Sequence, residues 1–159
     1  MKSTLVTGGT GLVGSAIHTN NINIKLSSSD CDLRNWDETL NTFLQLKPSY
    51  VIHCAAKVGG VGGNMNHKGE FFYDNIMINT NVIEASRVSG VEKLVAFLST
   101  CVFPDEVEYP LTEKKIHLGE PHSSNYPYAY AKRMLDIQSR AYREQYGVNY
   151  ISVIPTNIY

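Results

Sequence analysis

The sequence predicts an α/β fold of the Rossmann type, which is a doubly wound parallel sheet with helices on both faces. Apolar runs of strand length alternate along the chain with longer segments of helical periodicity. The first of these runs ends in a cluster of glycines, as nucleotide-binding sheets require. Right-handed crossovers leave few possible strand orders, and we expect the order 3-2-1-4-5.

The N-terminal stretch begins with the short β-branched run Thr4–Thr7 and continues into glycines spaced G-x-x-G-x-x-G. A strand, a tight glycine turn and a helix start bring several backbone N–H groups to one point, where a pyrophosphate can bind. A glycine-rich hairpin is the alternative interpretation. The expected cofactor contacts in this stretch are Gly8, Gly11, Leu12, Val13 and Gly14.

The remaining elements follow from periodicity and from glycine and proline boundaries. Helices are expected from Leu12 to about Thr19 and over Trp36–Leu46, Phe71–Ser89 and Pro127–Tyr146. Further strands are expected at 22–26, 51–56, 94–98 and 148–154. Glycines crowd the stretch Lys57–Gly69, for which we expect no regular structure.

Composition indicates one domain, residues 1–159, with 43% hydrophobic and 18% charged residues. The net charge of −1 gives no general attraction to nucleic acid or to an acidic membrane. No apolar run approaches the ~20 residues that span a bilayer, and the N-terminus lacks a signal-peptide profile. Cys31, Cys54 and Cys101 form neither a metal-ligand pattern nor a disulfide framework. We therefore expect a cytoplasmic protein without a metal site.

Tyr128 and Lys132 stand at i, i+4 on one predicted helix, and a nearby ammonium favours the phenolate by lowering the pKa of a tyrosine. Such a tyrosine can exchange a proton with a carbonyl oxygen. Ser99 follows the predicted fourth strand, at the sheet edge where ligands bind. The three side chains can converge beside a cofactor. The alternatives are an ordinary exposed helical pair and a serine that only caps a loop.

The end of the second strand bears on the choice of cofactor. Enzymes that use NAD place a carboxylate there for the ribose 2′-hydroxyl. Here Ser27 and Ser28 occupy that place and can donate to a phosphate, although Asp30 is close by. This favours NADP(H).

Several motifs together resemble the extended short-chain dehydrogenase/reductases, and within them the GDP-L-fucose synthase family. They are the glycine motif, Ala55–Gly60 (AAKVGG), Ser99–Pro104 (STCVFP), Tyr128–Arg133 (YAYAKR) and Pro155–Tyr159 (PTNIY). The resemblance implies an NADPH-dependent enzyme that epimerises C3 and C5 of GDP-4-keto-6-deoxy-mannose and then reduces C4.

The resemblance also implies roles for single residues. Tyr128, Lys132 and Ser99 would serve the hydride step, and Cys101 would be one acid/base of the epimerisation, with a buried inert cysteine as the alternative. Further cofactor contacts implied are Asp32, Leu33, Ala55, Ala56, Asn79, Lys132, Pro155 and Asn157. Substrate contacts implied are Val58, Gly59, Asn64 and Asn157. Asn75 is expected at the surface.

Members of the family continue beyond this segment into a substrate domain, so we expect the chain to be truncated before that domain. Two hypotheses remain open: an oxidoreductase completed by a partner, and a non-catalytic remnant that binds NADP(H) or pairs with a full-length homologue. Family members dimerise through a four-helix bundle, and the same helices here suggest a homodimer. The apolar residues expected at that surface are Phe72, Ile76, Ile83, Met134, Ile137 and Ala141.

Overall fold

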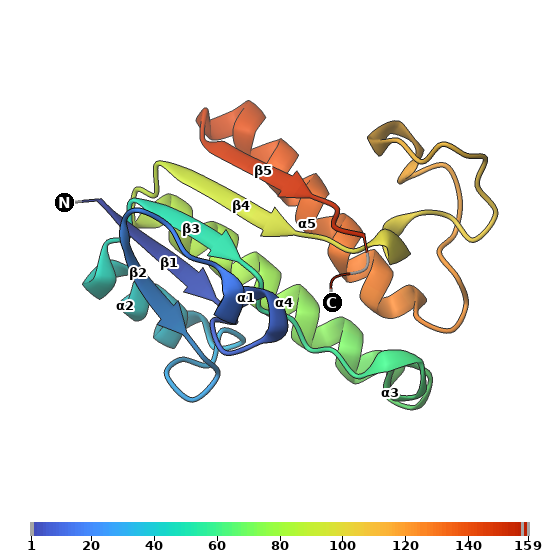
Figure 1. Ribbon diagram of the computed structural model, residues 1–159, viewed down its shortest axis with the longest axis horizontal. Helices are drawn as coiled ribbons and strands as arrows, with labels where there is room; N and C mark the ends of the chain where they lie inside the picture. Colours follow the sequence, from blue (N-terminus) through green and yellow to red (C-terminus); the bar gives the residue numbers. More distant parts are fainter. Residues whose placement is uncertain (1, 157, 159) are drawn as a thin grey trace.

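The computed structural model describes residues 2–156 and 158 and contains a five-stranded, fully parallel sheet (Figure 1). The strands are β1 (Ser3–Thr7), β2 (Ile22–Leu26), β3 (Tyr50–His53), β4 (Lys93–Phe97) and β5 (Asn149–Val153). The predicted fold class is confirmed. The predicted strand order is wrong, since the sheet runs β2-β1-β3-β4-β5.

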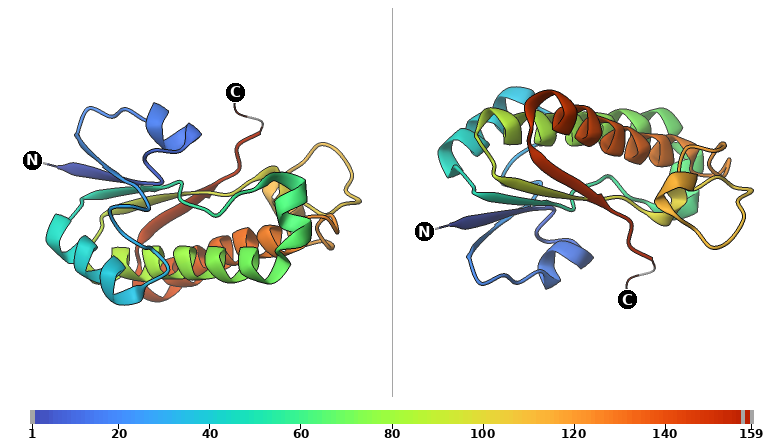
Figure 2. Two further views of the ribbon diagram at one scale, coloured as in Figure 1. Left: turned by 90° about the horizontal axis from the view of Figure 1, so that it is seen from below. Right: turned by 90° about the horizontal axis from the view of Figure 1, so that it is seen from above.

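The helices lie on both faces of the sheet, but unequally. They are α1 (Leu12–Ala16), α2 (Trp36–Leu46), α3 (Gly60–Asn66), α4 (Lys68–Val88) and α5 (Tyr126–Tyr146). Figure 2 shows α1 alone on one face, with α2, α4 and α5 covering the other. No helix within residues 2–156 is both long and apolar enough to cross a membrane.

The strand order follows from these two layers. The crossover from β1 to β2 uses α1 on one face, whereas every later crossover uses a helix on the opposite face. Helix α2, which links β2 to β3, packs with α4 on the face opposite α1. A right-handed crossover on that face runs in the opposite direction along the sheet, so β3 lies on the side of β1 away from β2. The winding therefore reverses between β1 and β3. Ligands bind at such reversal points, beyond the carboxyl ends of the strands.

The core is continuous from the central strands into the α4 and α5 layer. Leu5, Val51 and Leu94 are almost wholly buried, as residues in parallel strands covered on both faces are. Ile83 of α4 is also fully buried. The expectation that Ile83 belongs to a dimer surface is therefore wrong, because this side chain packs toward the sheet.

The glycine-rich stretch after β3 is partly helical, which corrects the expectation of irregular structure. The backbone N–H of Gly63 donates to Gly59 O at 3.2 Å, and Asn64 Nδ2 donates to Gly60 O at 2.7 Å. A Cβ built on Gly59 would lie 2.7 Å from the Phe71 ring. Glycine at position 59 therefore lets the Phe71 ring of α4 lie against the backbone at the start of α3.

Proline and glycine lie at the ends of the long helices, as predicted. Pro127 lies in the first turn of α5, and Gly147 ends that helix in the left-handed region with φ +67°. Gly90 follows α4 with φ +77°. α1 is shorter than expected, because Ile17 is already extended.

Candidate active site

A groove of about 610 Å³ opens at the carboxyl ends of β1, β2 and β3. It receives residues from the loops that follow all three strands, at the reversal point of the sheet. Most of the predicted cofactor contacts line it: Gly8, Gly11, Leu12, Val13, Gly14, Ser27, Ser28, Asp32, Leu33, Ala55 and Ala56. Its size and place suit a dinucleotide.

The glycine loop at the base of the groove is built for close approach. Gly8 has φ +67°, and a Cβ on it would lie 2.8 Å from the backbone nitrogen of Ala55. A Cβ on Gly14 would overlap the carbonyl oxygen of Gly8. The turn closes through the Gly11 N–H, which donates to Gly8 O at 3.0 Å. Without side chains at these positions, phosphate groups can approach the backbone N–H groups of the turn. The loop therefore fits the pyrophosphate of a dinucleotide.

The end of β2 carries serines at the groove and a carboxylate beside them. Asp30 accepts hydrogen bonds from the backbone N–H of Ser27 at 2.8 Å and from its hydroxyl at 2.5 Å. These bonds from Ser27 hold the pKa of Asp30 below its usual value. Asp30 is therefore committed to its own turn, whereas Ser27 and Ser28 line the groove.

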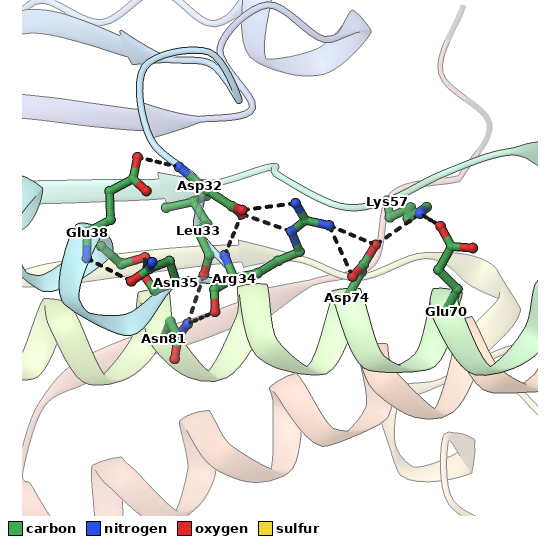
Figure 3. Close-up of polar contacts among 10 residues, drawn as sticks. Asp32, Leu33, Arg34, Asn35, Glu38, Lys57, Glu70, Asp74 and Asn81 are labelled. Atoms are coloured by element: carbon green, nitrogen blue, oxygen red, sulfur yellow. Dashed lines mark hydrogen bonds and ion pairs between the residues drawn. The ribbon is translucent and has the colours of Figure 1, made fainter.

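Two cations that the sequence analysis missed, Arg34 and Lys57, also line the groove. Arg34 lies beyond the Ser27–Ser29 turn, outside the strand end from which the cofactor was predicted. Figure 3 shows both side chains directed at Asp74 of α4. The only sequence signal for them was their position next to predicted cofactor contacts.

A second, smaller pocket of about 220 Å³ adjoins the groove, and Val58 lines both cavities. Its walls bring together three of the four predicted catalytic residues with two glycines at the start of α3. The lining residues are Val58, Gly59, Gly60, Asn64, Ser99, Cys101, Asn125 and Tyr128. Residues far apart in the sequence thus place a hydroxyl, a thiol, a phenol and two amides around one small pocket.

Lys132 lies behind Tyr128 and is 2% exposed. Its Nζ donates to the carbonyl oxygen of Phe97 at 2.8 Å and lies 5.9 Å from the centre of the Tyr128 ring. Burial lowers the pKa of Lys132 to about 8. Burial also raises the pKa of Tyr128 well above its ordinary value, with the neighbouring Cys101 as a second cause. The expected lowering of the tyrosine pKa is absent here, so Tyr128 is a neutral phenol with a proton to donate.

Ser99 and Cys101 meet at the start of the short 3-10 turn Thr100–Val102. Ser99 Oγ accepts a long hydrogen bond of 3.5 Å from the Cys101 N–H, which leaves the serine hydroxyl proton free to donate. Burial raises the pKa of the Cys101 thiol, and hydrogen bonding to Ser99 opposes this. The thiol is therefore protonated at neutral pH and suited to act first as an acid.

The family model for the NAD dependent epimerase/dehydratase family matches residues 4–159. The chain belongs to that family. It is 50% identical to a GDP-L-fucose synthase of Dictyostelium discoideum and 46% identical to a probable GDP-L-fucose synthase of Drosophila melanogaster, covering 99% and 100% of this chain. A GDP-L-fucose synthetase of Naegleria fowleri, solved bound to NADP, superposes with a TM-score of 0.92 at 46% identity over 99% of this chain and 54% of that one. The chain spans about half the length of the curated relatives it matches, 52% of each of these two.

In this epimerase/dehydratase family member, Asn79 does not face the groove as the resemblance implied. It is 2% exposed, and its amide is occupied at both ends. Its Oδ1 pairs with His53 Nε2 at 3.0 Å, and its Nδ2 donates to Ala131 O at 3.2 Å. Asn79 therefore joins β3 to α5 inside the core. The expectation that Asn75 is a surface residue is also wrong, since it is fully buried.

Two amide oxygens in the smaller pocket have no hydrogen-bond partner among the described residues. They belong to Asn64, which is 7% exposed, and to Asn125, which precedes α5. Buried acceptors without partners are rare in folded proteins, so both are suited to a ligand hydroxyl. Asn64 was predicted as a substrate contact, whereas Asn125 was missed.

Of the two contacts predicted at the C-terminal end, only Pro155 falls within the described residues. Pro155 is half-buried after β5 and is not among the residues that line either pocket. Asn157 lies outside the described residues.

Proposed function

We propose that the chain is an NADP(H)-binding epimerase/reductase of the GDP-L-fucose synthase type, with a GDP-linked 4-keto-6-deoxy-mannose as substrate. The observation that carries this proposal is the junction of the two cavities at Val58. A dinucleotide in the groove would end beside the chamber that contains Ser99, Cys101 and Tyr128. The relatives named as GDP-L-fucose synthases support the choice of substrate.

The cofactor proposed for the groove is NADP(H). The glycine loop fits its pyrophosphate, and Ser27 and Ser28 would receive the 2′-phosphate. The structure of the Naegleria relative bound to NADP supports this choice over NAD. When bound, NADPH supplies the hydride for reduction of a ketone.

The protein groups would manage protons and orientation. The Ser99 hydroxyl would donate a hydrogen bond to the substrate carbonyl oxygen. The neutral Tyr128 phenol would donate a proton to that oxygen as hydride reaches the carbonyl carbon. Lys132 would stabilise the resulting phenolate, because its ammonium lies near the ring. Cys101 would be one acid/base of the epimerisation: it would return a proton to a ring carbon next to the ketone after a second group had removed the original proton from the opposite face. The amide oxygens of Asn64 and Asn125 would accept from sugar hydroxyls.

A homodimer through α4 and α5 belongs to the same proposal. Three large apolar side chains on these two helices, Phe72, Met134 and Ile137, are 42%, 40% and 38% exposed. Because α4 and α5 pack side by side, these side chains supply apolar surface for a second copy of the chain. Sedimentation at increasing concentration tests this, and a monomer at every concentration would refute it.

The free cysteines Cys31, Cys54 and Cys101 fit a reducing compartment such as the cytoplasm.

The experiment that tests the function measures binding and turnover separately. Purified chain is titrated with NADPH and NADH by fluorescence, and GDP-4-keto-6-deoxy-mannose is then added while NADPH consumption and sugar products are followed. Tighter binding of NADPH with formation of GDP-L-fucose supports the full proposal. Tight NADPH binding without turnover supports the alternative of a cofactor-binding partner, while equal or reversed affinities refute the choice of NADP(H).

A further inference from the structure

Among the buried polar side chains of helix α4, three bind the loops that follow β2 and β3. Asp74, Asn75 and Asn81, which we call the α4 clamp, are 4%, 0% and 5% exposed. Buried polar groups are costly unless they find hydrogen-bond partners. All three find them on two loops that line the dinucleotide groove, as Figure 3 shows for Asp74 and Asn81.

The first loop follows β2. Asn81 Nδ2 donates to the carbonyl oxygens of Leu33 at 2.9 Å and Arg34 at 3.0 Å. The Arg34 guanidinium is held in turn by both oxygens of Asp32, each at 2.9 Å, and its Nη1 reaches Asp74 at 3.4 Å. This wall of the groove is therefore tied to α4 through both backbone and side chain.

The second loop follows β3. Asn75 accepts from the Lys57 N–H and donates to the Lys57 carbonyl oxygen, both at 3.0 Å. The Lys57 ammonium lies 3.0 Å from Asp74 Oδ2 and also pairs with Glu70. Asp74 is thus the one member of the clamp that contacts the side chains of both loops (Figure 3).

We propose that Asp74 is a positioning residue that fixes the distance between the two walls of the groove by binding Arg34 and Lys57 at once. The inference rests on the proposed binding of NADP(H). Arg34, Lys57 and Asp74 all line the groove, but the charged groups of Arg34 and Lys57 are directed to carboxylates, and Asp74 binds both of them (Figure 3). Their contribution is therefore the shape of the groove and not the recognition of the 2′-phosphate. An enclosed carboxylate serves this purpose well, because low local dielectric strengthens both pairs.

The test compares nucleotide affinities of Asp74→Asn with those of the wild-type chain. Asparagine keeps the size of the side chain and removes its charge, so both ion pairs are lost. We expect dissociation constants for NADPH and NADH to rise by the same factor, about tenfold, as for loss of one buried charged partner. The matched control is Glu84→Gln on the same helix, whose carboxylate pairs with Arg87 at 2.6 Å and does not line the groove. Its affinities should equal those of the wild type.

A double-mutant cycle with Arg34→Gln separates positioning from general destabilisation. If Asp74 acts through Arg34, the double variant binds NADPH more tightly than the product of the two single effects predicts. Unchanged affinities in folded Asp74→Asn, an effect on NADPH alone, or strictly additive effects would each overturn the proposal. If Asp74→Asn does not fold, Arg34→Gln and Lys57→Gln alter side chains that are 48% and 31% exposed, and each must weaken both nucleotides. A wild-type chain that binds neither nucleotide refutes the proposed function itself.

Discussion

His53 should make the protein sensitive to mild acid, although it does not line either cavity. The side chain is fully buried on β3 between Thr7 and Asn79. Because the Asn79 oxygen can only accept, His53 Nε2 carries the ring proton and Nδ1 accepts from the Thr7 hydroxyl at 2.7 Å. A second proton on the ring would force the Thr7 hydroxyl to accept instead of donate and would introduce a buried charge. Burial, with the Lys132 ammonium nearby, accordingly lowers the pKa of His53 from 6.5 to about 3.

The sign of the effect follows from proton linkage. Between pH 6.5 and pH 3 the unfolded chain binds a proton at His53 that the folded chain does not, so stability falls as the pH falls. The loss amounts to roughly 2 kcal/mol between pH 7 and pH 5, a range in which most carboxylates remain ionised. Urea unfolding at pH 7, 6 and 5 measures it for the wild type and for His53→Gln, which can keep both hydrogen bonds without titrating.

The wild type should lose more stability than the variant over this range, by about the same 2 kcal/mol. Equal slopes for the two proteins would refute the reasoning. Should the variant fail to fold, proton NMR of the wild type gives a second measurement. Ring resonances of His53 that titrate between pH 7 and pH 5 in the folded chain would contradict a buried neutral imidazole.

Three other predictions concern the site. Tyr128→Phe should lower the rate of ketone reduction by about 10²–10⁴ and leave the NADPH dissociation constant unchanged; a normal rate would exclude Tyr128 as proton donor. The Lys132 ammonium should lose its proton near pH 8, followed by NMR of its Cε group, and a midpoint near 10.5 would show that burial does not act as argued. Gly14→Ala should cost at least about 2 kcal/mol of stability in urea unfolding and abolish NADPH binding, because its methyl group overlaps a carbonyl oxygen across the turn. Gly62→Ala, with nothing within 4 Å of its Cβ, is the control and should lose almost nothing; a similar loss in both variants would refute the argument.

The elements near strong local signals could be predicted from the sequence alone. The run at β2 and the helix Trp36–Leu46 have the bounds that periodicity and proline gave. Glycine motifs located the groove, because a positive φ at Gly8 and close packing at Gly14 exclude other side chains whatever the rest of the chain does. Spacing at i, i+4 placed Tyr128 beside Lys132 for the same local reason.

Features that depend on several elements at once were decided only by the tertiary structure. The strand order turned on which face α2 occupies, and no local pattern reports the packing of α2 on α4. Asn75 and Asn79 look alike in a helical sequence, yet one binds the Lys57 backbone and the other joins His53 to α5. The protonation of Tyr128 was predicted from one neighbouring charge, whereas burial by the folded chain dominates it. Short stretches of residues thus determine local backbone conformation. The burial of a side chain and its hydrogen-bond partners depend on contacts between distant stretches, which form only in the folded chain.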